Sequence, residues 1–109
     1  MQPKLKVWIL FGRRTKFGAG RAQLLTLIDE LGSLKKAVDR MGMSYRNAWG
    51  YLRELEQAAG FKLLKRQPGP RGGARLTKRG RVLLEQSRQF ERRSQEAVTR
   101  AFKKSFEKT

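Results

Sequence analysis

The sequence predicts a mainly α-helical α+β fold, with one small domain followed by a long C-terminal helix. Three observations support this prediction. Apolar residues recur at helical spacing from residue 21 to residue 59, two glycine-containing turns are flanked by strand-like sequence, and neither proline nor glycine occurs after Gly80. Because 109 residues allow only one modest core, we expect a single domain at residues 1–80 and the helix at residues 81–109.

The chain is strongly basic. Lysine and arginine number 26 against 9 acidic residues, which gives a net charge of +17 and an isoelectric point near 11.5. Such a charge attracts polyanions, and nucleic acid is the leading candidate partner. We expect no membrane partner, because no apolar run approaches the roughly 20 residues of a spanning helix and no signal peptide is visible. The expected location is cytoplasmic, in association with a bacterial or archaeal nucleoid.

Cysteine and histidine are both absent from the chain. Their absence excludes disulfides, thiol nucleophiles, histidine bases and metal sites built on either residue type. The acidic residues all fall on expected helices with basic neighbours, as is typical of solvated helix faces, and no two carboxylates are arranged for acid–base chemistry. We therefore expect neither an enzyme nor a cofactor, and no small-molecule ligand site is evident.

The N-terminal region is expected to form a β-hairpin. Residues 4–10 alternate in polarity and are rich in β-branched and aromatic types, which predicts a strand. Residues 12–14 then turn the chain, and residues 15–17 return as a second, shorter strand. Trp8 is expected on the outer face or against a partner. The side chains expected to face the core are Leu5, Val7 and Ile9.

Three helices are expected next. Residues 21–31 carry a broad apolar stripe, which suits a helix buried on one side. The helices at residues 33–41 and 44–59 each begin with a serine whose hydroxyl can cap free backbone amides. Gly42 ends the first of them, where a left-handed backbone is needed. The expected core consists of Leu24, Leu27, Ile28, Leu31, Leu34, Ala37, Val38, Met41, Ala48, Leu52 and Leu55.

A short helix, a tight turn with glycine and a longer second helix form the pattern of a helix-turn-helix, whose second helix enters the DNA major groove. Arg46 is suited to a bidentate contact with guanine and Asn47 to a pair with adenine. The alternative is a plain helical hairpin, in which Trp49 and Tyr51 are core aromatics. The residues assigned to DNA on this helix are Ser44, Tyr45, Arg46, Asn47, Trp49 and Arg53.

A second hairpin is expected after Gly60. Strands at residues 61–66 and 75–77 would flank a loop rich in glycine and proline, and residues 62–81 contain eight basic residues and no acidic one. After a helix-turn-helix, this is where a wing would meet phosphates or the minor groove. A solvated linker is the alternative. The wing residues assigned to DNA are Lys65, Arg66, Arg71 and Arg75.

Two strings are distinctive: Met-Ser-Tyr-Arg-Asn-Ala-Trp at residues 43–49 and Gly-Gly-Ala-Arg-Leu-Thr at residues 72–77. With them, residues 4–90 resemble the N-terminal domain of ModE-type, molybdate-responsive transcription regulators. More distantly, the chain is similar to LysR-type winged helix-turn-helix regulators, with which it shares the Gly-Ser at residue 32 and the Leu-Glu at residue 55.

The resemblance implies a homodimeric regulator that binds a pseudo-palindromic operator in double-stranded DNA through residues 44–58 and a basic wing. ModE-type regulators carry C-terminal oxyanion-binding domains, for which these 109 residues leave no room. Molybdate sensing is therefore not expected in this chain, which is either a natural single-domain relative or a DNA-binding fragment.

The region from Thr77 to about Phe106 predicts one long helix of about 42 Å, longer than the small core can cover. The similar helix in the resembling families builds the dimer. The alternatives are an exposed helix, a frayed basic tail or a helix lying on a membrane. The residues assigned to dimerisation are Leu83, Phe90, Ala97 and Phe102.

The expected fold is thus an α+β winged helix-turn-helix with an N-terminal β-hairpin and a long C-terminal dimerisation helix. The expected function is sequence-specific DNA binding for transcription control. Two other functions remain open. The charge of +17 is also typical of a non-specific nucleoid or architectural DNA-binding protein, and the basic helix is compatible with an adaptor that docks on an acidic protein surface.

Overall fold

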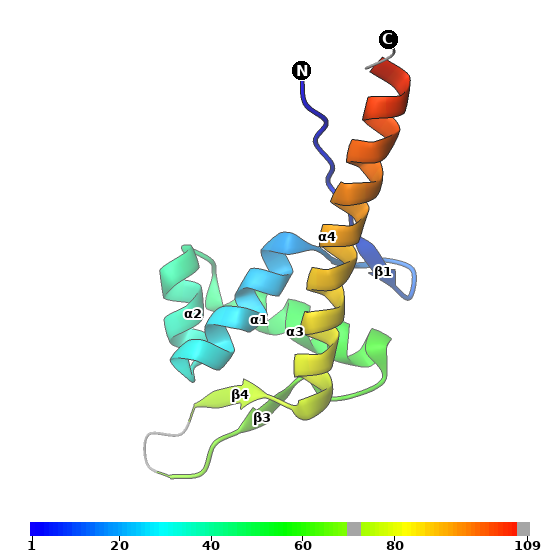
Figure 1. Ribbon diagram of the computed structural model, residues 1–109. Helices are drawn as coiled ribbons and strands as arrows, with labels where there is room; N and C mark the ends of the chain where they lie inside the picture. The colour runs from blue at the N-terminus through cyan, green and yellow to red at the C-terminus, as the bar shows by residue number, and fades with distance from the viewer. Residues whose placement is uncertain (70–72, 107–109) are drawn as a thin grey trace.

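The computed structural model describes residues 1–69 and 73–106 and has the predicted winged helix-turn-helix architecture (Figure 1). Two small antiparallel hairpins and four helices follow one another in the expected order. Three helices form the body, the second hairpin is the wing, and the last helix rises from the base of the wing. The elements are β1 (Ile9–Phe11), β2 (Thr15–Phe17), α1 (Ala19–Leu31), α2 (Leu34–Met41), α3 (Tyr45–Ala59), β3 (Leu64–Arg66), β4 (Ala74–Leu76) and α4 (Lys78–Phe106).

Both helices of the helix-turn-helix begin at the predicted serine caps. The hydroxyl of Ser33 accepts a hydrogen bond from the Lys36 amide at 3.1 Å, and the hydroxyl of Ser44 accepts one from the Asn47 amide at 3.2 Å. Each bond satisfies a backbone donor that the first helical turn leaves free. Gly42 ends α2 with a φ of 68°, a left-handed conformation that favours glycine. The predicted turn between the two helices is therefore confirmed.

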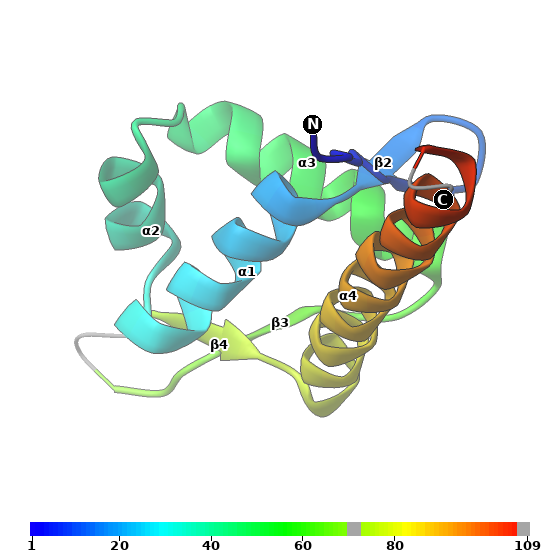
Figure 2. The same ribbon diagram turned by 45° about the horizontal axis from the view of Figure 1, so that its top comes forward.

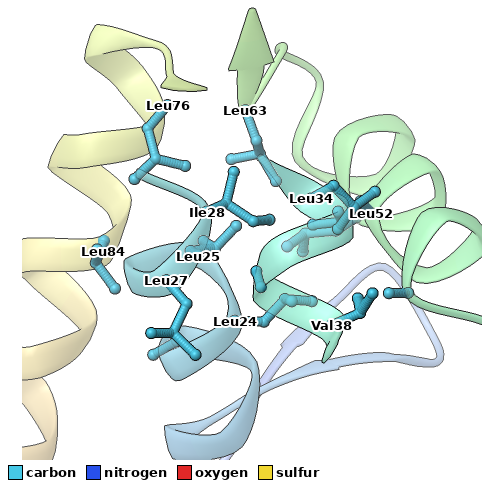
Figure 3. Packing of buried hydrophobic residues seen from close by; sticks show 14 of the residues in the cluster. Leu24, Leu25, Leu27, Ile28, Leu34, Val38, Leu52, Leu63, Leu76 and Leu84 are labelled. Carbon is cyan, nitrogen blue, oxygen red and sulfur yellow. The ribbon is translucent and has the colours of Figure 1, made fainter. Parts of the chain in front are cut away.

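One apolar core lies between α1, α2 and α3, and Figure 3 shows Leu76 of β4 and Leu84 of α4 on one side of it. The predicted helical stripes supply most of it, while Leu31 and Met41 are only half-buried at its edge. Several residues that the predicted core did not include are buried, because they come from the first hairpin, the wing and α4 or lie at the edge of the apolar stripe of α1. These residues are Phe17, Ala22, Leu25, Leu63, Leu76 and Leu84.

The predicted N-terminal hairpin is confirmed, but its first strand, expected at residues 4–10, is wrong for residues 4–8. Strand β1 comprises only Ile9–Phe11 and pairs with β2 from Ile9↔Phe17 to Phe11↔Thr15. The physical reason is the length of β2, because α1 begins at Ala19 and leaves no strand with which residues 4–8 could form a hydrogen-bonded ladder. Leu5 is consequently exposed, and Phe17 rather than a residue of the first strand anchors this hairpin in the core.

Helix α4 begins where predicted, because the Thr77 hydroxyl accepts a hydrogen bond from the Gly80 amide at 3.0 Å. Its first half packs on α1 through Leu84, and the Arg88 guanidinium donates to the Thr26 hydroxyl at 2.6 Å. Its second half extends beyond the body, as Figures 1 and 2 show. Among the described helices, none combines the length and the apolar character that a membrane crossing requires.

Candidate nucleic-acid interface

Helix α3 presents the predicted DNA-contacting residues to solvent. Its core side carries Ala48, Leu52 and Leu55, which are all buried. Tyr45 and Trp49 lie on the outer side and are 49% and 46% exposed. The alternative in which Trp49 is a core aromatic is therefore excluded. The other predicted residues of this helix and its cap that are exposed are Ser44, Arg46, Asn47 and Arg53.

Two of these side chains are organised before any partner is present. The Cζ atom of Arg53 lies 4.7 Å from the centre of the Trp49 ring, one helical turn away. A guanidinium over an indole face gains a cation–π attraction while its edge stays available for hydrogen bonds. The pair thus holds one positive charge in a defined place on the outer face of α3.

A groove of about 1230 Å³ separates the outer face of α3 from the wing. Helix α3 contributes Tyr45, Trp49 and Arg53 to its walls, and β3 contributes Lys65 and Arg66. The structure therefore brings five predicted residues from two elements to one concave surface. Ser44, Arg46 and Asn47 lie outside this lining, at the start of α3. Lining residues without a predicted DNA contact include Lys35, Gln57, Phe61 and Lys62.

The wing carries two predicted cations directly opposite each other. Lys65 of β3 and Arg75 of β4 are partners in the antiparallel register, and both are exposed. Directly opposed residues share one face of a hairpin, where two like charges repel. A polyanion lying along that face would relieve this repulsion. The predicted residue Arg71 lies outside the described residues.

A carboxylate of α3 fastens the first strand of the wing. The Oε2 atom of Glu56 accepts hydrogen bonds from the backbone amides of Leu63 at 2.7 Å and Leu64 at 3.2 Å. Lys62 Nζ lies 3.8 Å from the other carboxylate oxygen. The prediction that every acidic residue is a solvated surface group is therefore wrong for Glu56, whose side chain is 17% exposed.

A second carboxylate fastens the other strand. Asp29 of α1 accepts a hydrogen bond from the Leu76 amide at 3.0 Å and two from the Arg81 guanidinium at 3.2 and 3.3 Å. Partial burial by itself raises the pKa of Asp29, but the hydrogen bonds from Arg81 and Leu76, with the charges of Arg81 and Arg75, outweigh it. The pKa of Asp29 therefore lies below its ordinary value.

The base of the wing also packs closely against the body. The Ala74 amide donates to the Gly32 carbonyl at 3.0 Å, at the junction of α1 and α2. Gly73 has a φ of 104°, and a side chain there would collide with the same carbonyl. These contacts join residues more than 40 positions apart, so no local sequence pattern could have revealed them. They hold the wing at a fixed place beside α3.

A family model described as "Bacterial regulatory helix-turn-helix protein, lysR family" matches residues 21–81, from α1 into the first turn of α4. The chain belongs to this family. Its helix-turn-helix is therefore that of a DNA-binding regulator of transcription, in agreement with the exposed basic face of α3. The match does not include the β1–β2 hairpin or most of α4.

Several solved structures have a similar fold. The CbnR DNA-binding domain in complex with DNA is 22% identical, with a TM-score of 0.59 over 79% of this chain and 95% of that one. ArgP from Mycobacterium tuberculosis is 25% identical, with a TM-score of 0.55 over 76% of this chain and 30% of ArgP. CbnR, described as a LysR family transcriptional regulator, is 24% identical, with a TM-score of 0.58 over 77% of this chain and 28% of that one. The chain thus spans less than a third of ArgP and of this CbnR chain. No curated protein matches it.

Proposed function

We propose that the protein is a sequence-specific transcription regulator that binds a pseudo-palindromic operator as a homodimer. In this proposal α3 lies in the major groove and the β3–β4 wing lies on the adjacent phosphate backbone. The observation that carries it is the groove in which Tyr45, Trp49 and Arg53 of α3 face Lys65 and Arg66 of β3. The DNA in the CbnR domain complex, a structure of similar fold, supports the choice of partner.

The two elements have different tasks in this proposal. Base edges in the major groove are read by side chains at the start of the recognition helix, so Arg46 and Asn47 carry sequence preference. The cations of the wing neutralise phosphates and supply affinity for any duplex. Arg75 and Arg71, which lies between β3 and β4 in the sequence, are among these phosphate-binding cations.

The dimer rests on the part of α4 that projects from the body. On that part Phe90 is 43% exposed, and Ala97, two turns further on, is exposed as well. Phe102 is half-buried and stacks on Phe106, with the ring centres 5.0 Å apart. Leu83 packs partly against the molecule's own core, at the start of this seam. Residues 1–80 then form the DNA-binding unit and residues 81–109 the dimerisation helix. A two-fold axis would place two α3 helices about one DNA turn apart.

The proposal also assigns the chain to the ModE-type branch, which is a finer assignment than the LysR-type family. It is supported by the two distinctive strings, because residues 43–49 supply Tyr45 and Trp49 to the groove and residues 72–77 include Gly73 at the base of the wing. The controlled genes can be found from the operator once its sequence is known. A location in the cytoplasm, with the chromosome, agrees with this role.

Selection of duplexes from a random pool at about 0.15 M salt tests this function, because generic phosphate attraction is damped at that ionic strength. We expect an inverted repeat whose half-sites lie about one turn apart. Retention of duplexes without any enriched sequence, with binding that collapses as salt rises, would instead support the architectural protein. Weak binding of every duplex at this salt concentration would support the adaptor.

A further inference from the structure

The β1–β2 hairpin lies against the side of α3, and the family match does not include it (Figure 2). The Tyr51 hydroxyl of α3 donates a 2.7 Å hydrogen bond to the Lys16 carbonyl of β2. At the hairpin turn, Gly12 lies close enough to α3 that a β-carbon on it would be 3.8 Å from the Ala58 side chain. The Arg21 guanidinium lies 4.2 Å from the centre of the Tyr51 ring and covers this joint.

The two hairpins flank the outer face of α3 from opposite sides. Tyr51 and Ala58 are seven residues apart, so they share one side of the helix, which is the side that holds β1–β2. Glu56 lies elsewhere on the circumference and holds the β3–β4 wing. At about 100° per residue, Arg46 and Arg53 fall between these two attachment sides, on the arc away from the core. The outer face of α3 is therefore bounded by a hairpin on each side.

The β1–β2 hairpin, like the wing, belongs to a stretch of sequence that carries basic residues and no acidic one. Residues 1–20 contain five basic residues and no acidic one. Arg13 and Arg14 form its turn, both are exposed, and neither forms an ion pair with a residue that the structure describes. Unpaired guanidinium groups beside a DNA-reading helix are complementary to phosphates. The five basic residues are Lys4, Lys6, Arg13, Arg14 and Lys16.

We propose that the β1–β2 turn is a second wing, whose Arg13 and Arg14 contact the phosphate backbone on the side of the major groove opposite the β3–β4 wing. This inference rests on the proposed function of α3. A helix in the major groove has a phosphate backbone on each side, because the groove is only about 12 Å wide. The β3–β4 wing reaches one backbone, and the turn beside Ala58 reaches the other. The recognition helix is thereby held in the groove from both flanks.

The test compares the salt dependence of DNA binding for the wild type and the Arg13→Ala/Arg14→Ala variant. Each lost phosphate contact lowers the slope of log K against log salt by about 0.9, so we expect a decrease of about two per protomer, with the preferred sequence unchanged. Hydroxyl-radical footprinting on the selected operator should lose protection only at the backbone flank next to the C-terminal end of α3.

Two variants serve as controls. Arg100→Ala/Lys103→Ala removes the same charge from exposed positions on the projecting half of α4, and we expect a change in slope of less than half as much. Arg13→Lys/Arg14→Lys keeps the charge and should keep most of the slope. Circular dichroism and sedimentation verify that each variant has the fold and mass of the wild type.

The inference is overturned if the slope of Arg13→Ala/Arg14→Ala equals that of the wild type or of the α4 control. The slopes are measured on the selected operator and on an unrelated duplex, so the result is decisive even if no sequence is enriched. An absence of enrichment contradicts the proposed operator binding. An enriched operator that the arginine variant binds with an unchanged slope contradicts the second wing alone.

Discussion

Glu56 of the recognition helix accepts a 2.7 Å hydrogen bond from the backbone amide of Leu63, at the first strand of the wing. One side chain thus joins α3 to the wing, the two elements to which the proposed function assigns base reading and phosphate binding. The Leu64 amide shares the same carboxylate oxygen, so two donors depend on it. Any movement of the wing relative to α3 has to break these bonds first.

Removal of this carboxylate should destabilise the fold. Glu56→Ala leaves the amide of the buried Leu63 without an acceptor, which costs about 1–3 kcal/mol of unfolding free energy in urea titrations. Glu56→Gln keeps one acceptor oxygen and should cost less. The matched control is Glu54→Ala, an exposed carboxylate on the same helix, for which we expect a change within about 0.5 kcal/mol. Equal losses at positions 54 and 56 would show that the hydrogen bonds contribute nothing.

The carboxylate of Asp29 should make stability depend on pH in the acid range. Its pKa in the folded protein is lowered, so its contribution is present above the ordinary value of 3.8 and is lost as the pH falls through the lower folded pKa. Asp29→Asn should therefore be less stable than the wild type at pH 7, and the difference should shrink towards pH 2. Urea unfolding of both proteins across this range measures it. A difference that stays constant with pH would contradict the role of the charged carboxylate.

Arg46 and Lys65 should affect DNA binding in different ways. Arg46→Ala is expected to reduce discrimination at one base pair by about 1–3 kcal/mol, because it removes a contact with a base edge. Lys65→Ala is expected to weaken binding to all duplexes alike and to lower the salt slope by about one. Binding isotherms on the operator and its single-base variants distinguish these effects. Identical consequences of the two substitutions would refute the division between base reading and phosphate binding.

Charges on the projecting half of α4 should separate the dimer. Phe90→Glu/Ala97→Glu places four carboxylates at a two-fold seam, and we expect a monomer by sedimentation that retains the helical circular dichroism of the wild type. Gln89→Glu/Lys103→Gln changes the net charge by the same amount at exposed positions on the other side of α4 and should leave the mass unchanged. A dimeric Phe90→Glu/Ala97→Glu variant would remove this seam from the interface.

Local sequence rules were sufficient for the helical part of the fold. The caps at Ser33 and Ser44, the left-handed Gly42 and the start of α4 after Thr77 each depend on interactions within four residues, so a linear pattern reveals them. The exposed face of α3 follows from its helical period in the same way. The spacing of Ala48, Leu52 and Leu55 determines which side is buried.

The errors arose where distant parts of the chain decide the outcome. Residues 4–8 have the composition of a strand, but a strand needs a partner, and the start of α1 at Ala19 limits the length of that partner. Asp29 and Glu56 have basic neighbours like other surface carboxylates, yet they meet backbone donors of Leu76 and Leu63 that only the folded wing brings to them. The DNA-binding roles of Arg71 and of the other assigned residues stay predictions.

Thr77 is the single residue between the wing and α4. Its hydroxyl donates to the Lys62 carbonyl at 2.7 Å and accepts from the Gly80 amide at 3.0 Å, so it connects the segment just before β3 to the first turn of α4. Helix α4 contains no glycine after Gly80 and no proline that could act as a hinge. In a dimer joined by α4, the two DNA-binding domains would therefore be held at a fixed distance and orientation. One extra base pair at the operator centre turns one half-site by about 35° relative to the other. Because such a dimer cannot follow that rotation by bending, we expect its binding to depend on the length of the operator as strictly as on the operator sequence.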